Sequence, residues 1–403
     1  MDRSRSMVST KVKAGATRAP ANGQAKLLQH KNILVVADML PLFDQPGGSS
    51  RLKTMLDMLG SAGWNIIFGS FAELDGQPGL FAAPEGRTRC EKILQDIGVT
   101  HILYGPGQIE QYLAKRGQNL NWVFLSFSKI ATALMPLVRS HCPAARVAYD
   151  MVDFRDLQMM REAEMRGDET LRAGAERKHA EELACARVAD VTLVVTMEEK
   201  AALLGGLPEA AVEVLPNVCE IPQQPPEPRG RKNMLFVGDF RHMPNGDAVH
   251  WFAEKILPLI RREYPEIVFR IAGADPGNDI LALAALPGVE VLGSVPDPAP
   301  LYHQHRISVA PFRYGAGMKN KIEQSLAFGL PVVATFIGTE GMGLKDGQHL
   351  LIGKDEEAFA SHIINLLQDD ALWTNLSAAG RAHIEQSLSA TAVRGRWESI
   401  LGG

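Results

Sequence analysis

Short apolar runs alternate with segments of helical spacing along the chain, and this alternation constrains the fold more than any other feature. The first run reads NILVVA over Asn32–Ala37, and further runs follow at residues 65–68, 101–104, 122–125, 146–149 and 191–195. Between the first two runs, apolar side chains at positions 52, 55, 56 and 59 lie on one helical stripe. Short β-branched strands that alternate with helices predict βαβ units on a parallel sheet.

The pattern is interrupted by a proline-rich segment and then starts again. Residues 216–232 read PNVCEIPQQPPEPRGRK, which is typical of a linker between domains. A new run, MLFVG, begins at Met234. Pro244 and Asn245 then open an amphipathic helix, and runs at 268–272 and 289–292 follow. We therefore predict an α/β protein with two Rossmann-like, doubly wound domains that face a central cleft, where ligands bind outside the carboxyl ends of the strands.

The predicted domain boundaries follow from these interruptions. Residues 1–31 form a basic tail, 32–216 the first domain, 217–232 the linker and 233–385 the second domain. Two helices at about 355–367 and 371–383 close the second domain. We expect the last helix, residues 386–403, to pack back on the first domain.

Composition excludes several classes of protein. The chain has 403 residues, of which 22% are charged and 46% are hydrophobic, as in an ordinary soluble globular protein. A net charge of -4 and a pI near 6.3 argue against a general nucleic-acid binder. Four cysteines without a CxxC spacing favour a reducing cytoplasm and no zinc site, and the histidines also lack metal-ligand spacing. No apolar run is long enough to span a membrane, and the N-terminus lacks the apolar core of a signal peptide.

The N-terminal tail is the one strongly basic segment. It carries seven basic residues and a single acidic residue, Asp2; the basic residues are Arg3, Arg5, Lys11, Lys13, Arg18, Lys26 and Lys31. Two interpretations stay open. The tail is either disordered or weakly attracted to the inner face of an anionic membrane, at about 1 kcal/mol per basic residue near the surface.

A long charged segment follows the first domain's fifth run. Residues 156–187 are rich in Arg, Glu and Ala and predict one helix. This helix is either a solvated surface helix with i,i+4 ion pairs or a wall or lid of the acceptor cleft.

The segment PFRYGAGMKNKIEQSLAFGLPVVAT, residues 311–335, carries the clearest chemical signal. A strand at 307–312 leads into a turn with Gly315 and Gly317, then a helix of about 319–328, and then a strand at 332–334. Glycines that let the backbone approach a ligand, followed by a helix N-terminus with Lys319 and Lys321, suit two phosphates of a nucleotide. An ordinary strand–turn–helix crossover with solvated lysines is the alternative.

Several ordered motifs together resemble a known family. They are Gly238-Asp239-Phe240, Pro244-Asn245, the GSVPD segment at 293–297, and the glycine-turn segment that ends GLPVVAT. This order resembles the family 4 glycosyltransferases (glycosyl transferases group 1) of the GT-B fold over residues 233 to about 385. The N-terminal half resembles the family more loosely, through PGGS at 46–49 and YDMVD at 149–153.

The resemblance implies a retaining transfer of a sugar from a nucleotide sugar, UDP- or GDP-linked, to a hydroxyl acceptor, with no metal or other cofactor. The acceptor is a glycan, a lipid-linked molecule or a protein, which points to biosynthesis of a surface glycan or glycoconjugate. We therefore expect a cytoplasmic enzyme with no nucleic-acid partner. A sugar epimerase of similar fold is a weaker alternative.

By the same resemblance, the donor contacts the glycine loops, the basic side chains and the segment after the next strand. Gly47 and Gly48 face its phosphates from the N-terminal half, and Gly315 and Gly317 face its sugar and diphosphate. Arg241, Lys319 and Lys321 meet the phosphates, the GSVPD segment holds the base, and Thr339, Glu340 and Gly341 lie near the diphosphate or sugar.

On the acceptor side, Asp150 and Asp153 are the candidates for positioning or deprotonating the acceptor; the alternative for both is capping and turn formation after a strand. Arg155 is a candidate for binding an anionic acceptor or the phosphates.

The chain departs from the family at one motif. Many members have two glutamates separated by seven residues, and these positions hold Ala316 and Gln324 here, with Glu323 next to the second. A glutamine can still hydrogen-bond a ribose diol, and we expect Gln324 to lie nearer the ribose than Glu323. The missing first glutamate leaves the donor sugar undetermined. It also supports an alternative function, a catalytically inactive partner subunit that binds nucleotide sugar.

Overall fold

The computed structural model describes residues 31–41, 48–76, 84–152, 154–223 and 227–402, and side chains at 48–50 are outside this description. Residues 1–30 of the basic tail, Gly47 and Asp153 therefore lie outside the described residues. Within the described residues, no helix is both long and apolar enough to cross a lipid bilayer.

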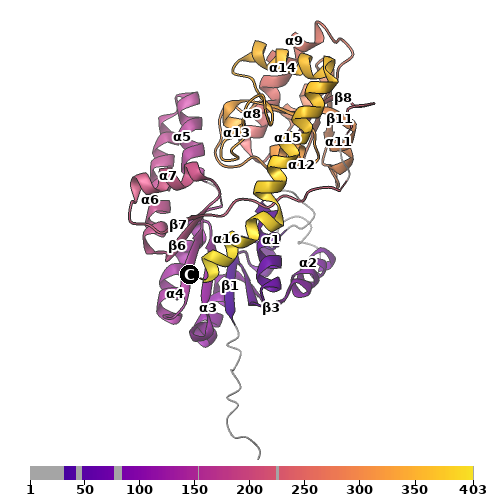
Figure 1. Cartoon of the computed structure of the whole chain (residues 1–403). Coiled ribbons are helices and arrows are strands. Elements are labelled where there is room, and N and C mark those ends of the chain that lie inside the picture. The colour runs from indigo at the N-terminus through magenta and orange to yellow at the C-terminus, as the bar shows by residue number, and fades with distance from the viewer. Residues whose placement is uncertain (1–30, 42–47, 77–83, 153, 224–226, 403) are drawn as a thin grey trace, which may run out of the picture. The chain divides into compact units, whose positions relative to one another are not determined.

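The N-terminal half is built on a parallel sheet (Figure 1). Its described strands lie in the order β3-β2-β1-β4-β5-β6-β7. The inner strand β1 carries Ile33, Leu34, Val35 and Val36, which are fully buried because both faces of the sheet are covered. The strands are β1 (Asn32–Ala37), β2 (Asn65–Ser70), β3 (Val99–Tyr104), β4 (Trp122–Ser126), β5 (Arg146–Asp150), β6 (Val191–Val194) and β7 (Val212–Val214).

Helices cover both faces of this sheet and enclose two apolar clusters. They are α1 (Gly48–Ser61), α2 (Pro84–Ile97), α3 (Gly105–Arg116), α4 (Ser128–His141), α5 (Arg155–Arg166), α6 (Glu169–Val188) and α7 (Met197–Gly206). The last helix, α16 (Ala390–Gly402), also belongs here. Its Val393, Trp397 and Ile400 join the cluster that holds Phe124, and α16 lies beside α1 (Figure 1).

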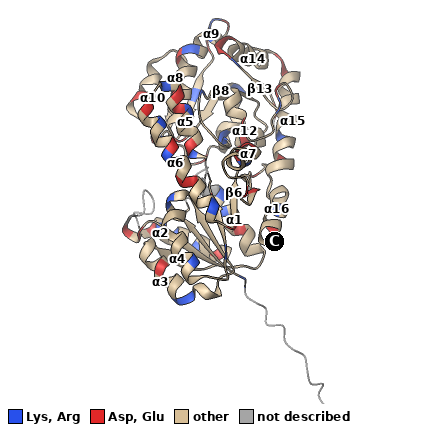
Figure 2. Ribbon diagram, turned by 90° about the vertical axis from the view of Figure 1, so that its left-hand side faces the viewer, with Lys and Arg blue, Asp and Glu red and all other residues tan. Residues whose placement is uncertain are grey.

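The charged segment predicted as one helix is a helical hairpin, so that prediction was wrong. Gly167 ends α5 in a left-handed conformation with φ 66°, and Asp168 caps α6 by accepting hydrogen bonds from the amides of Thr170 and Leu171. A glycine followed by an N-cap residue is a standard helix stop and restart. Acidic and basic residues occur along both helices (Figure 2), so the Gly167-Asp168 stop and restart was not recognised within the charged segment.

The C-terminal half is built on a second parallel sheet in the order β10-β9-β8-β11-β12-β13. The strands are β8 (Lys232–Val237), β9 (Phe269–Ala272), β10 (Val289–Gly293), β11 (His305–Ala310), β12 (Val332–Ala334) and β13 (Leu351–Ile352). One large apolar cluster, which includes Phe236, Phe252, Phe269 and Trp373, fills its core.

The helices of this half are α8 (Met243–Trp251), α9 (Leu257–Arg261), α10 (Asn278–Ala282), α11 (Ala299–Gln304), α12 (Asn320–Ala327), α13 (Phe336–Thr339), α14 (Glu356–Gln368) and α15 (Asp370–Leu388). A π-helical turn, Phe252–Ile256, joins α8 to α9. Short 3-10 turns occur at Leu74–Gly76, Gly117–Asn119 and Leu283–Ala285.

The predicted fold class is confirmed: two parallel sheets alternate with helices. The expected strands agree with the structure to within about two residues at each end. The sequence did not predict β7 and β13, because strands of three and two residues give too short a pattern. The parallel order places the ends of β8, β11 and β12 at one edge of the second sheet, where the predicted donor residues follow them.

Candidate functional site

The glycine turn between β11 and α12 has a backbone that only glycine adopts readily. Gly315 has φ +140° and Gly317 has φ +69°. Two cations hold its carbonyl oxygens. Lys319 Nζ donates to the carbonyls of Ala316 and Gly317, both at 2.7 Å, and Arg161 Nη1 donates to the carbonyl of Gly315 at 2.6 Å. The turn is therefore fixed through three consecutive carbonyls.

The amides on the other side of these peptides are available. In a trans peptide the N–H points opposite to the carbonyl, so the amides of Ala316, Gly317 and Met318 point away from Arg161 and Lys319. None of the three donates a hydrogen bond to another described residue. Consecutive amides that face one way in a glycine turn form a concavity suited to an anion.

Lys319 and Lys321 have different environments, although both were predicted to meet phosphates. Lys319 is the N-cap residue of α12 and is buried, with its ammonium turned back onto the glycine turn. Lys321 is partly buried. Its Nζ donates to Asn245 Oδ1 at 2.7 Å and lies over the Phe312 and Phe236 rings. Within the described residues Lys321 forms no ion pair. Burial, together with the neighbouring charge of Lys319, lowers its pKa to about 7.

His242 completes a cluster of basic groups around this lysine. It precedes α8, and the loss of surrounding water together with the charges of Lys321, Lys319 and Arg155 lowers its pKa to about 4. Arg155, at the start of α5, is exposed and forms no ion pair with another described residue. We call Arg155, His242, Lys319 and Lys321 the cation cluster. The positive charges that lower the pKa values of Lys321 and His242 make a site that favours an anion.

Arg241 is engaged differently from the prediction that it meets phosphates. Its guanidinium binds the Asp239 carboxylate two residues earlier, at 2.5 to 3.0 Å, and lies 3.2 Å from Asp275. Burial alone would raise the pKa of Asp239, but hydrogen bonds from Arg241 lower it overall. Arg241 is exposed in the segment between β8 and α8, and its contact with a phosphate stays a prediction.

Glu323 and Gln324 face different neighbours on α12. Glu323 is buried, with Oε1 accepting from Asn217 Nδ2 at 3.3 Å. Burial raises its pKa to about 7, against the opposing effects of Asn217, Lys319 and Arg51. Gln324 Oε1 accepts from the Tyr302 hydroxyl at 3.0 Å. The glutamate therefore lies on the side of the cation cluster, and the glutamine lies against α11.

The segment after β12 reaches the same region. Thr339 is buried and donates its hydroxyl to the carbonyl of Phe336. Glu340 forms a two-pronged ion pair with Arg161, at 2.6 and 2.8 Å. Gly341 has φ +79°, and a Cβ there would lie 2.1 Å from Cγ2 of Thr196, so this backbone approaches the start of α7 too closely for any side chain.

Asp150, the predicted acceptor residue, is part of a buried ion pair. Its Oδ1 accepts from Arg51 Nη2 at 2.8 Å, and the Arg51 Nη1 donates to the carbonyls of Leu215 and Pro216. Both side chains are more than nine-tenths buried. Asp150 thus ties α1 to the end of β5 and the linker, and its role toward an acceptor stays a prediction. Gly48 is the first residue of α1.

Sequence reasoning missed three residues that organise the site, namely Arg51, Arg161 and Asn245. Asn245 joins Lys321 to the carbonyl of Asp239 through its two amide atoms. Its signal was present in the Pro244-Asn245 motif. Arg51 and Arg161 gave no local signal, because their partners lie about 100 or more residues away in the chain.

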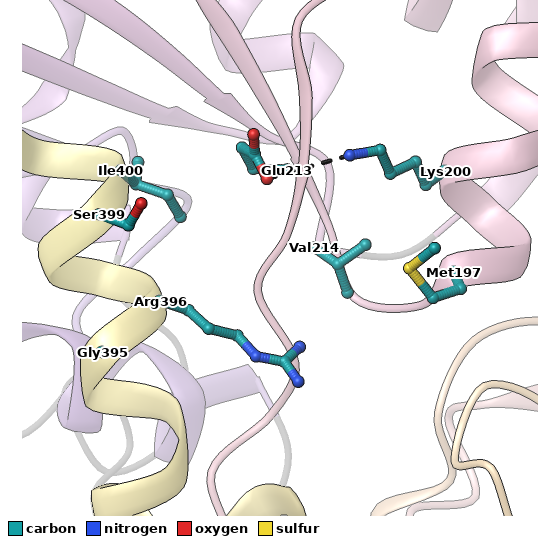
Figure 3. A pocket seen from close by; sticks show the side chains of 8 residues that line it. All are labelled: Met197, Lys200, Glu213, Val214, Gly395, Arg396, Ser399 and Ile400. Carbon is teal, nitrogen blue, oxygen red and sulfur yellow. Dashed lines mark ion pairs between the residues drawn. The ribbon is translucent and has the colours of Figure 1, made fainter. Parts of the chain in front are cut away.

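A separate hollow of about 360 Å³ lies between α7, β7 and α16. Figure 3 shows Lys200 and Glu213 facing each other beside it, with Arg396 extending from α16. None of the predicted site residues lines this hollow, so it is distinct from the cation cluster.

Comparison with solved structures identifies the fold. Sucrose-phosphate synthase from Thermosynechococcus elongatus superposes with a TM-score of 0.68 at 16% identity, covering 92% of this chain and 98% of that one. The Anabaena protein HepE in complex with UDP-glucose gives a TM-score of 0.63 at 14% identity, covering 93% of this chain and 100% of that one. These likenesses show that the chain has the GT-B fold.

The sequence comparisons match the C-terminal half to a family. A family profile, glycosyl transferases group 1, matches residues 231–369. An uncharacterised 44.6 kDa protein in the cps region of Klebsiella pneumoniae is 33% identical over 142 residues. That match covers 33% of this chain and only about a third of the relative, 36% of its length. Residues 231–369 thus match the group 1 glycosyltransferases, as the C-terminal motifs predicted, and the chain as a whole has the GT-B fold.

Proposed function

We propose that this protein binds a nucleoside diphosphate sugar at the cation cluster and transfers the sugar to a hydroxyl acceptor with retention of configuration. The observation that carries the proposal is the combination of three available amides at the glycine turn with Lys321, a lysine that has no ion-pair partner among the described residues. A diphosphate supplies the negative charge that this arrangement lacks. Fixed donors aimed at a departing diphosphate stabilise the charge that develops in the transition state.

The relatives support the choice of substrate class. HepE was solved with UDP-glucose, and a pneumococcal O-GlcNAc transferase, which is 15% identical and has a TM-score of 0.56, was solved with UDP and GlcNAc. The location of the Klebsiella relative in a cps region supports a role in polysaccharide biosynthesis. We propose a UDP- or GDP-linked donor, a glycan, lipid-linked or protein acceptor, and a cytoplasmic location.

The leaving diphosphate does not require a metal ion in this proposal, because basic side chains and amides take its charge. We therefore expect transfer to persist in EDTA. Strict recovery of activity by Mg²⁺ or Mn²⁺ after chelation would contradict this part of the proposal.

The first experiment is a thermal-shift panel of UDP, GDP, dTDP and their sugars, followed by calorimetry on any nucleotide that stabilises the protein. One base that stabilises the protein at micromolar concentration supports the donor site, and the absence of any shift across the panel contradicts it. The inactive-subunit alternative, favoured by Ala316 and Gln324, predicts binding of the sugar nucleotide without release of nucleoside diphosphate.

A pair of alanine variants locates the nucleotide on α12. Because Glu323 lies on the side of Lys319 whereas Gln324 binds Tyr302, we now expect Glu323→Ala to weaken nucleotide binding more than Gln324→Ala. Loss of one such hydrogen-bond partner is worth roughly 1 kcal/mol, or about fivefold in affinity. A larger effect at Gln324 would support the family's alignment register instead.

A further inference from the structure

One arginine connects the α5–α6 hairpin to the glycine turn. Arg161, on α5, donates from Nη1 to the carbonyl of Gly315 and to Glu340 Oε2, both at 2.6 Å, and from Nη2 to Glu340 Oε1 at 2.8 Å. The two side chains are 27% and 18% exposed, so the pair is largely shielded from water. A two-pronged guanidinium–carboxylate contact fixes orientation as well as charge.

The contact extends along a turn of α5. Tyr314, which precedes Gly315, is 1% exposed. Burial raises the pKa of its hydroxyl, and Glu162 on α5 raises that pKa further while Arg166 opposes the shift. Positions 161, 162 and 166 of one helix therefore face Tyr314, Gly315 and Glu340 together.

The orientation of the Gly315–Ala316 peptide depends on this contact. Glycine is conformationally permissive, and at φ +140° Gly315 has no side chain to hold it. Arg161 holds its carbonyl, and the amide of Ala316 points the opposite way because the peptide is planar. Lys319 holds the next two carbonyls but does not bond to that of Gly315 in the described contacts. Arg161 thus sets the direction of the first available amide.

We propose that Arg161 is a positioning residue for the donor. It holds the glycine turn and Glu340 in the arrangement that accepts a nucleoside diphosphate sugar, and it acts through these two groups rather than by touching the donor. This proposal rests on the proposed function. It also gives the hairpin a role as a wall of the donor site, in place of the wall or lid of the acceptor cleft that was one of the two interpretations of the charged segment.

The test compares three single variants of the full chain. Arg161→Ala removes the contact. Arg161→Lys keeps the charge but not the planar fork. Arg177→Ala removes an exposed guanidinium from the same hairpin as the matched control. Dissociation constants are measured by calorimetry for UDP-glucose, GDP-mannose and dTDP-glucose. For the ligand that binds the wild type, we expect a loss of at least tenfold in Arg161→Ala, an intermediate loss in Arg161→Lys and less than twofold in Arg177→Ala.

A double-mutant cycle with Glu340→Ala separates positioning from direct contact. If Arg161 acts through Glu340, the double variant binds much more tightly than the product of the two single losses predicts. Losses that multiply would overturn the proposal. Thermal unfolding of the ligand-free variants checks folding, and Arg161→Lys decides the question if Arg161→Ala does not fold.

The two proposals fail in different ways. A wild-type protein that binds none of these nucleotides overturns both the donor site and the role of Arg161. A wild-type protein that binds a nucleotide, with unchanged affinity in Arg161→Ala, overturns the role of Arg161 alone.

Discussion

Binding of a nucleoside diphosphate should take up a proton, because Lys321 is largely neutral above pH 7 in the free protein. Burial and Lys319 lower its pKa to about 7. A bound diphosphate places negative charge beside the ammonium, which favours the protonated form and returns the pKa toward the ordinary value of about 10.4. The protein must then acquire the missing proton from the buffer.

The size of the effect follows from these two pKa values. With a pKa of about 7, roughly one tenth of Lys321 is protonated at pH 8, and almost all of it is protonated in the complex. We therefore expect uptake of about 0.5 proton per nucleotide at pH 7 and about 0.9 at pH 8. The dissociation constant should rise about tenfold per pH unit between pH 8 and 9. The phosphate's own second ionisation, near pH 6, and the low pKa of His242 contribute little in this range.

Calorimetry in buffers of different ionisation enthalpy measures this uptake directly. Lys321→Arg is the main control, since an arginine stays charged at pH 8 and should bind nucleotide without proton uptake. Lys354→Met removes an exposed lysine of the same half and should leave the uptake unchanged. Tight binding at pH 8 with no proton uptake in the wild type would refute the reasoning.

The same lysine should destabilise the ligand-free protein. A basic group whose pKa is lower in the folded state than in the unfolded state reduces the free energy of unfolding. This loss of stability is fully present below the folded-state pKa and disappears as the pH rises to the unfolded-state pKa. For Lys321 that window runs from about pH 7 to about pH 10.4. Lys321→Met should therefore raise the unfolding temperature of the free protein at pH 7 more than at pH 9.5. An equal change at both pH values would contradict the lowered pKa.

Two further predictions concern the framework. Arg51→Met leaves a carboxylate buried without its partner and should cost about 3–5 kcal/mol in denaturant unfolding, whereas Lys53→Met, in an exposed i,i+4 pair, should cost less than about 0.5 kcal/mol. Gly341→Ala should cost about 2–4 kcal/mol through its positive φ and its clash with Thr196, while Gly347→Ala, with a similar φ and open space, should cost only about 1 kcal/mol. Equal losses of unfolding free energy in Arg51→Met and Lys53→Met would contradict the role of the buried ion pair. Equal losses in Gly341→Ala and Gly347→Ala would contradict the role of the close approach to Thr196.

Local sequence patterns were sufficient for most of the strands and for the turn. The buried strands β1 and β12 were found because a short continuous run of apolar residues rich in β-branched side chains gives a strong signal over few residues. The turn at Gly315 and Gly317 was found because only glycine suits its backbone. Both features depend on residues that are neighbours in the chain.

The contacts that organise the site could not be found in this way. Arg161 and Glu340 are 179 residues apart, and Arg51 and Asp150 are 99 apart. In a charged helix, an arginine that bonds to a distant carbonyl and an arginine that is solvated have similar neighbours in the sequence. The local sequence therefore does not distinguish them. Such pairs follow from topology, because parallel strands bring their carboxyl ends, and the loops after them, to one edge of a sheet.

The two lysines of the turn illustrate why the number of basic residues at a site does not predict how each one acts. Lys319 donates a hydrogen bond to each of two carbonyls and makes the glycine turn rigid. The amides of the same peptides are therefore oriented before any ligand binds. Lys321 meets a neutral amide and two aromatic rings, and it shares the field of Lys319 without an ion-pair partner among the described residues. The contacts of Lys319 reduce the rearrangement that the glycine turn would otherwise undergo during catalysis. The position of Lys321 leaves its ammonium charge uncompensated, and a bound diphosphate would compensate it. Lys319 therefore supplies rigidity and Lys321 supplies uncompensated positive charge, two residues apart in one segment. An anion that binds the amides of the glycine turn also lies near the ammonium of Lys321.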